Sequence, residues 1–339
     1  MTPELLVGGL AVVALITYAV LGGADFGGGI WDLFARGPRK QEQRAAIADA
    51  MGPVWEANHV WLIFVIVLLF SGFPAAYGAL SIGLFLPFHI VLLGIIMRGA
   101  AFVFRAYSPR AAGGTPGPQA RRWGAIFGAA SVVTPVLLGM CLGAVSSGAM
   151  RVEAGTVHFL STPWLAPVAL AIGALALALC AYLAAVFLTI ETEGALQEDF
   201  RTRALLAGTA VVVLSAGLVP LLRTEATHLW EGLVRGPGLV ALVPGIIAAL
   251  LSGWALRARR YRLARVAAVI QIGCLVLGWA AAQYPYIIYP DVTLANAAGP
   301  RSTLLFILYS TPVGMALLLP SLWYLFRVFK ARNPLARDA

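Results

Sequence analysis

Long apolar runs alternate with short polar segments along the whole chain. A run of about 20 apolar residues is the length that an α-helix needs to cross a membrane. We expect a membrane-spanning helix in each of nine runs: 5–33, 52–73, 80–105, 123–147, 163–190, 204–222, 239–256, 266–283 and 303–327. The pattern predicts an all-α, polytopic membrane protein that forms one integral domain over residues 1–339.

The order of the runs suggests an internal duplication. The third and seventh runs both end in Arg-rich segments, and the fourth and eighth both contain glycine and follow short loops. This weak likeness relates 1–150 to 160–285 and leaves the last helix, 303–327, outside the repeat. We therefore expect two four-helix bundles plus one peripheral helix.

Composition agrees with a membrane protein. Hydrophobic residues make up 60% of the 339 residues, charged residues only 12%, and the mean hydropathy is +0.86. A soluble domain of this length could not bury so much apolar surface. A formal charge of +9 would favour nucleic acid as a partner of a soluble protein. Here the charge lies in short loops between spans, so no nucleic-acid partner is expected.

The termini and the cysteines add two expectations. The first residues lack the basic start of a signal peptide, so 5–33 is expected to be retained as a helix. Cys141, Cys180 and Cys274 lie inside apolar runs without a CxxC pair. They are expected to pack in the interior and to form neither a disulfide nor a metal site.

Positive charge is distributed unevenly between the two sets of loops. The segments after the first, third, fifth and seventh spans, together with the C-terminal tail, hold most of the 24 Lys and Arg residues. The opposite loops hold only Arg151, Arg223, Arg235 and Arg301. Because Lys and Arg gather in cytoplasmic loops, we expect the N-terminus outside and the C-terminus in the cytoplasm.

The stretch 52–61, GPVWEANHVW, is the densest polar and aromatic group beside an apolar run. It holds Glu56, Asn58 and His59. At 1.5 Å per residue, Glu56, His59, Asp25 and Arg98 lie roughly 5–12 Å inside the cytoplasmic face. Ionisable groups at that depth are unfavourable unless paired, hydrated or functional, and Arg98 could neutralise Asp25 or Glu56. We expect these groups, from three consecutive spans, to form one cluster.

Several interpretations of this cluster remain open from the residues alone. It could be an ion pair and hydrogen-bond network that only joins the first three spans, or a path by which protons enter from the cytoplasm. It could also be the coupling site of a secondary transporter, although the inverted repeats of such proteins are not seen. His89 or His59 could ligate haem, but a lone membrane histidine is more often hydrogen-bonded to a neighbouring helix. The glycines at 27–29 favour close helix packing.

Four landmarks in order carry a resemblance to a known family. They are ADFGGGIWDL at 24–33, GPVWEANHVWL at 52–62, Arg98-Gly99 followed by Phe104-Arg105, and QYPYIIYPDVTLANAAGPRSTL at 283–304. With these landmarks, the chain resembles subunit II of the cytochrome bd-type quinol oxidases over essentially its whole length.

The resemblance implies a bacterial cytoplasmic-membrane enzyme that oxidises quinol and reduces dioxygen to water. It implies that two haems b and one haem d are held by a larger partner subunit, and that no cofactor is assigned to this chain. Quinone, lipid and a small single-helix subunit are further expected partners.

The resemblance also suggests roles for the cluster. It matches Glu56 to a carboxylate of a cytoplasmic proton path, and Asp25 to a family carboxylate in the first span. We expect Glu56 and Asp25 to carry protons and Arg98 to balance their charge. The remaining expected members are Asn58 and His59 as hydrogen-bonding relays, and Trp55 and Trp61 as shapers of a cavity or an oxygen route.

The chain departs from the family pattern at three positions. Many relatives carry Asp at the position of Gly22, Glu at that of Val103, and Asp at that of Glu56. A proton path that depends on the first two acids would have to run differently in this chain.

Overall fold

The computed structural model describes residues 2–108, 117–153, 155–159 and 162–331, apart from the side chains of 51–56, 106, 326 and 329–331. The longer helices are α1 (Pro3–Leu33), α2 (Lys40–Gly72), α4 (Phe85–Tyr107), α5 (Pro118–Ser147), α6 (Pro167–Glu191), α7 (Gly194–Glu225), α9 (Leu239–Arg257), α10 (Tyr261–Gln283) and α11 (Arg301–Ala331). The shorter elements are helices α3 (Pro74–Gly83), η1 (Pro163–Leu165) and α8 (Thr227–Val234), and strands β1 (Met150–Glu153), β2 (Thr156–Phe159), β3 (Tyr286–Ile288) and β4 (Val292–Thr293).

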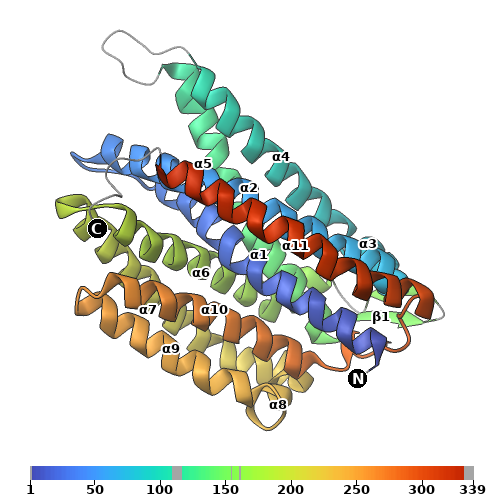
Figure 1. Ribbon diagram of the computed structural model, residues 1–339. Helices are drawn as coiled ribbons and strands as arrows, with labels where there is room; N and C mark the ends of the chain where they lie inside the picture. The colour runs from blue at the N-terminus through green and yellow to red at the C-terminus, as the bar shows by residue number, and fades with distance from the viewer. Residues whose placement is uncertain (1, 109–116, 154, 160–161, 332–339) are drawn as a thin grey trace.

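The long helices run side by side along one direction (Figure 1). In the described ranges, eight helices are long and apolar enough to cross a membrane, and a broken pair, Ala57–Gly72 with Pro74–Gly83, raises the number to nine. Helices α1, α2, α4 and α5 form one group, and α6, α7, α9 and α10 form the other. Helix α11 lies at the edge against α2 and α1. The predicted class of an all-α membrane protein with two bundles and a peripheral helix is confirmed.

The expected third span, 80–105, is broken in the structure. Helix α3 ends at Gly83, and α4 begins at Phe85 after Leu84, whose ψ of 26° departs from helical geometry. Pro87 explains the break, because it has no N–H to donate to Gly83 and it is tolerated only in the first turn of a helix. Helix α3 is bent by 116° from the end of α2.

Two helices extend well beyond the apolar runs from which their spans were predicted. The spans predicted at 52–73 and 204–222 belong to α2 and α7, whose N-terminal turns are polar and begin at Lys40 and Gly194. These extra turns lie at the Arg-rich end of the molecule. At the opposite end, β1–β2 and β3–β4 form two short antiparallel hairpins.

Helix α1 is the member of the first group that faces the second: it contacts α6 as well as α2 and α5. Its glycines allow this close approach. A Cβ added at Gly27 would lie 1.9 Å from the carbonyl oxygen of Cys180 on α6, and one at Gly29 would lie 2.0 Å from Ser131 Oγ on α5. The interpretation of 27–29 as a packing surface is confirmed.

Candidate functional site

The central feature of the site is a buried ion pair between α1 and α4. Arg98 donates from Nη1 to Asp25 Oδ2 at 2.5 Å and from Nη2 to Asp25 Oδ1 at 2.7 Å. The same Nη2 also donates to the Asp25 backbone oxygen at 2.8 Å. The Asp25 and Arg98 side chains are 1% and 2% exposed. A buried pair of this kind is stable only when its geometry is good and its remaining polar atoms are satisfied.

Other helices complete the environment of this pair. Asn58 on α2 donates to Asp25 Oδ2 at 2.7 Å, and Arg98 Nε donates to Ser131 Oγ on α5 at 2.9 Å. The Arg98 guanidinium also lies over the rings of Phe26 and Phe127, at 5.1 and 4.6 Å from their centroids. Polar contacts and aromatic faces therefore surround the charge, and the cluster joins α1, α2, α4 and α5.

A second ion pair, which the sequence analysis missed, repeats the first one closer to the Arg-rich end. Arg105 contacts both carboxylate oxygens of Asp32, at 2.8 and 3.0 Å, and Arg44 Nε lies 3.6 Å from Asp32 Oδ1. Asp32 is 2% exposed. Asp32 follows Asp25 by seven residues, and Arg105 follows Arg98 by seven. Because the spacing runs in the same direction on both helices, α1 and α4 are parallel. This equal spacing was the signal in the sequence.

Tyr18 occupies the space next to Gly22. A Cβ added at Gly22 would lie 3.2 Å from Tyr18 Cε2. The Tyr18 hydroxyl and the Trp61 indole N–H are both buried and have no hydrogen-bond partner in the described part of the chain. Trp61 belongs to the same hydrophobic cluster as Tyr18 and packs edge-on against Phe64 at 6.4 Å.

The structure brings some of the expected site residues together and leaves others apart or unplaced. Asp25, Arg98 and Asn58 are in direct contact. His59 follows on α2 and is half-buried. Trp55 and Glu56 fall within α2, but their side chains lie outside the described residues. Val103 is 47% exposed on the surface of α4.

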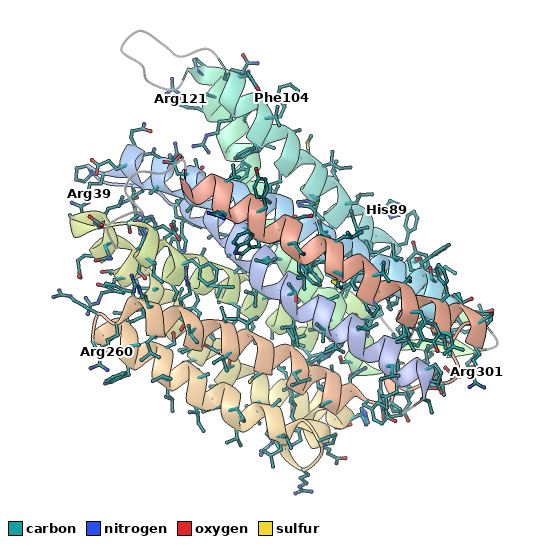
Figure 2. The ribbon with its side chains drawn as sticks, in the orientation of Figure 1. Arg39, His89, Phe104, Arg121, Arg260 and Arg301 are labelled. Atoms are coloured by element: carbon teal, nitrogen blue, oxygen red, sulfur yellow. The ribbon has the colours of Figure 1, made fainter. Side chains whose placement is uncertain are left out.

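His89, a candidate haem ligand, projects from the surface of α4 (Figure 2). Its Nδ1 lies 2.7 Å from the Phe85 backbone oxygen, and its exposed ring packs against the Phe85 ring at 4.0 Å. This placement does not fit a haem enclosed by the helices of this chain. In the described ranges, no group of three or more His, Cys, Asp and Glu side chains is arranged as metal ligands would be.

Polar networks at the Arg-rich end connect the two groups of helices. Asp199 on α7 accepts from Arg39 at 2.5 and 2.8 Å and from Gln43 at 3.1 Å. The Asp199 carboxylate holds the pKa of the Arg39 guanidinium above its usual value, because the contact stabilises the charged form. Arg203 donates to Gln43 at 2.6 Å and lies over the Trp31 ring at 5.2 Å.

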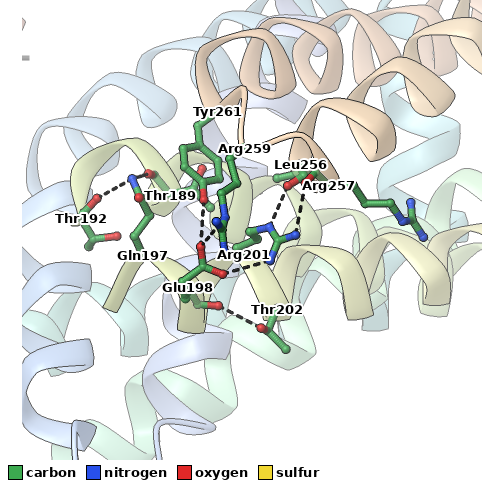
Figure 3. Close-up of polar contacts among 10 residues, drawn as sticks. All are labelled: Thr189, Thr192, Gln197, Glu198, Arg201, Thr202, Leu256, Arg257, Arg259 and Tyr261. Carbon is green, nitrogen blue, oxygen red and sulfur yellow. Dashed lines mark hydrogen bonds and ion pairs between the residues drawn. The ribbon is translucent and has the colours of Figure 1, made fainter. Parts of the chain in front are cut away.

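A separate network joins α7 to the turn between α9 and α10 (Figure 3). Glu198 is 3.0 Å from both Arg201 Nη1 and Arg259 Nε, and Tyr261 donates to it at 3.4 Å. Arg201 also donates from Nε to the Leu256 backbone oxygen at 2.8 Å.

Known proteins resemble this chain over nearly its full length. A family model described as cytochrome bd terminal oxidase subunit II matches residues 3–329. The putative cytochrome bd menaquinol oxidase subunit II of Bacillus subtilis is 23% identical over 326 residues, covering 92% of this chain and 91% of the relative. The cytochrome bd ubiquinol oxidase subunit 2 of the same organism is 31% identical over 196 residues, covering 58% of this chain and 55% of the relative.

The fold is also similar to a solved structure. A chain of the bd oxidase from Geobacillus thermodenitrificans superposes with a TM-score of 0.80 at 24% identity, covering 97% of this chain and 99% of that one. At this identity, the likeness concerns the fold.

Proposed function

The chain belongs to the cytochrome bd terminal oxidase subunit II family, and we propose that it supplies its oxidase with a proton path from the cytoplasmic side and a scaffold for a haem-bearing subunit. It is a multi-pass bacterial membrane protein and a subunit of an oxidoreductase complex. This membership favours the oxidase subunit over the secondary transporter that the sequence left open. In our proposal, the larger subunit holds the haems, where quinol is oxidised and dioxygen is reduced to water.

The observation that carries the proton path is the buried cluster around Asp25. Ionisable groups inside a membrane protein are rare and commonly mark proton routes. Here a carboxylate from α1, an amide from α2 and a guanidinium from α4 meet in an interior that is otherwise apolar. We propose that Glu56 and Asp25 carry protons and that Arg98 balances their charge. Asn58 and His59 would act as relays, and Trp55 and Trp61 would shape the adjoining space.

The contacts of Asp25 restrict how it could take up a proton. Oδ2 already accepts two hydrogen bonds, from Arg98 and Asn58, whereas Oδ1 accepts one side-chain bond, from Arg98. A carboxylate oxygen has two lone pairs, so a proton can add to Oδ1 without displacing a donor. Asp25 could therefore be protonated while Asn58 and Arg98 keep Oδ2 in place.

Oxygen consumption by the Glu56→Gln complex tests the path. We expect a loss of about tenfold or more in turnover, because a missing proton carrier slows the proton-coupled step. The haem absorbance should be retained. Glu153→Gln, at an exposed position in the β1–β2 hairpin, is the matched control and should be silent. Unchanged turnover in Glu56→Gln would exclude its proton role, and lost haem absorbance would assign Glu56 to assembly.

A purely structural scaffold is the second candidate, and the same ion pair favours it. Arg98 contacts both oxygens of Asp25 and joins helices that are distant in sequence, which is what a structural contact would do. Under this alternative, the pair could be replaced by apolar residues without loss of turnover.

The orientation and the remaining partners complete the proposal. Arg39, Arg121 and Arg260 lie toward one end of the molecule and Arg301 lies at the other (Figure 2). We propose that the first end faces the cytoplasm, with the N-terminus outside and the C-terminus inside, and that quinone, lipid and a small single-helix subunit contact the complex. Labelling of Arg121→Cys and Arg301→Cys variants in intact cells, with the unsubstituted protein as the control for Cys141, Cys180 and Cys274, tests this orientation, because only Arg301→Cys should add reaction with an impermeant reagent.

A further inference from the structure

The turn between α9 and α10 carries more positive charge than the protein neutralises. This turn and the adjoining ends of the two helices contain Arg257, Arg259, Arg260 and Arg262, all exposed. Arg259 has a positive φ of 56° and its guanidinium pairs with Glu198 on α7. The other three have no carboxylate within ion-pair distance in the described ranges. The turn therefore presents three cations that no described side chain balances.

Two of these cations converge on one helical turn of α9. Arg257 Nη1 lies 3.4 Å from the Gly253 backbone oxygen, and the Arg260 guanidinium lies 5.1 Å from the centroid of the Trp254 ring. The side chain of Arg257 extends away from Glu198 in Figure 3, and Arg260 projects outward in Figure 2. Because Gly253 has no side chain, the Arg257 guanidinium can lie along the helix beside Trp254.

An apolar face continues from this turn toward the middle of the membrane. Val243, Ile247, Leu250 and Trp254 follow each other at spacings of three and four residues, which places them on one face of α9. They are 48%, 59%, 70% and 50% exposed. No other described segment of the chain covers this face. The arginines at the end of α9 match the charged headgroup of a phospholipid, and the exposed apolar face beside them matches its acyl chains.

We propose that this surface, Trp254, Arg257 and Arg260 with the apolar face beneath them, binds an anionic phospholipid. The phosphate of the headgroup is held between the two guanidinium groups, and an acyl chain lies along Leu250, Ile247 and Val243. In the orientation proposed above, on which this inference rests, the turn lies on the cytoplasmic side, where basic pockets of membrane proteins suit anionic headgroups. The unbalanced charge favours an anionic lipid over a zwitterionic one.

The opposite end of the protein offers a comparison within the same chain. Arg223 lies over Trp230 at 4.7 Å, much as Arg260 lies over Trp254. There, however, Glu225 and Glu231 lie close in sequence to Arg223 and Arg235, so the local charge is balanced. An Arg–Trp contact alone does not provide the proposed site, and this end is expected to show no preference for anionic lipid.

Lipid retention by the purified complex containing the full-length chain tests the proposal. After delipidation, phosphatidylglycerol or phosphatidylcholine is added and retained lipid is counted by native mass spectrometry. We expect Arg257→Gln/Arg260→Gln to lower retention of phosphatidylglycerol about tenfold or more, since each arginine near a lipid headgroup contributes measurably. Arg257→Lys/Arg260→Lys should retain most of the binding, and Arg223→Gln/Arg235→Gln, with the same loss of charge, should bind as the unmodified protein does.

Each other outcome overturns the site. Unchanged retention in Arg257→Gln/Arg260→Gln would place the lipid elsewhere, and an equal loss in Arg223→Gln/Arg235→Gln would indicate a general charge effect. Displacement of the lipid by excess inorganic phosphate alone would overturn the acyl-chain contact with Leu250, Ile247 and Val243, because binding would then not depend on the apolar face. Absence of both lipids from the surface in the assembled complex would mean that a protein subunit covers α9. An unchanged haem spectrum and elution volume in the Gln variants exclude misfolding as the cause.

Discussion

Arg98 on α4 contacts both carboxylate oxygens of Asp25 on α1, at 2.5 and 2.7 Å, in the buried centre of the first group of helices. Arg105 and Asp32 repeat this contact seven residues further along the same two helices. The two ion pairs together determine the register of α4 against α1. A shift by two helical turns would pair Arg98 with Asp32 and leave one acid and one arginine without partners.

Removal of one charge from the inner pair should destabilise the protein strongly. In Asp25→Asn, the Arg98 guanidinium stays buried without a counter-charge, and such losses amount to about 3–5 kcal/mol. In contrast, Asp199→Asn breaks a partly exposed pair with Arg39, and a loss of about 1 kcal/mol or less is expected. Thermal unfolding of the purified complexes measures both. Equal losses in the two variants would contradict this account of the buried pair.

The double variant Asp25→Leu/Arg98→Leu separates a proton-carrying role from a structural one. Apolar residues of suitable volume can replace a buried ion pair with little loss of stability. Recovered stability together with full oxygen consumption would assign the pair to the scaffold. Recovered stability without turnover would support Asp25 as a proton carrier.

Replacement of Gly27 tests the packing of α1 on α6. In Gly27→Ala, the new Cβ would meet the Cys180 carbonyl oxygen at 1.9 Å, so the two backbones must separate. We expect a loss of about 3 kcal/mol or more, at the upper end for an overpacked interior. Gly9→Ala, where the added Cβ has no neighbour within 4 Å, should be neutral or slightly stabilising. Chemical unfolding curves compare the two. Similar stability in both variants would argue against the close approach.

Restoring an acid at position 22 should fail unless Tyr18 is also reduced in size. Gly22→Asp brings a carboxylate into the space that the Tyr18 ring fills, and it buries a charge without a partner. We expect a loss of about 3 kcal/mol or more. Gly22→Asp/Tyr18→Ala should recover part of this loss, because the cavity left by the ring can admit the carboxylate and water. Yield of folded complex, followed by its haem absorbance, is the measurement. Full yield of Gly22→Asp alone would show that Tyr18 does not obstruct this position.

The contact between the β1–β2 and β3–β4 hairpins should show an acid-dependent stability. Arg151 donates to both oxygens of Asp291, and this contact holds the pKa of the Asp291 carboxyl below its usual range, because the cation favours the ionised form. The contact therefore contributes its full stability above the unfolded pKa of about 3.9, and loses it as the pH falls through the lower folded value. The difference in unfolding temperature between the unmodified protein and Asp291→Asn should be constant near neutral pH and shrink below about pH 4. A difference that grows on acidification would contradict this assignment.

Much of the fold follows from the hydrophobic pattern, because an apolar run of sufficient length has one stable form in a membrane. The same reasoning could not place the break at Leu84, since hydropathy does not detect a helix that Pro87 interrupts. The polar first turns of α2 and α7 were also missed. They are stabilised by contacts between distant helices, such as Arg39 with Asp199, and not by their own apolarity. The internal repeat of 1–150 in 160–285 stays a prediction.

The candidate site was predictable in part. The depths estimated along the spans predicted that Asp25 and Arg98 lie at a similar level in the membrane, and the structure places them in contact. The pair of Asp32 with Arg105 was not predicted, although the spacing of seven residues recurs on both helices. The contribution of Ser131 could not be foreseen, since nothing in its local sequence indicates which helix it faces.

The distance in sequence between the partners has a consequence for synthesis. Asp25 and Asp32 each precede their arginine by 73 residues. At roughly 5–20 residues per second, α1 exists for roughly 4–15 s before Arg98 is made. In that interval, the newly made helix has two acids and no basic partner on α4. Its stable insertion into the membrane should therefore require the synthesis of α4. Ribosome-bound chains that end before Phe85 should be extracted from membranes by alkali more readily than chains long enough for α4, which ends at Tyr107, to have left the ribosome, and equal retention would contradict this. Translation order would then determine when the first helix becomes a permanent part of the membrane.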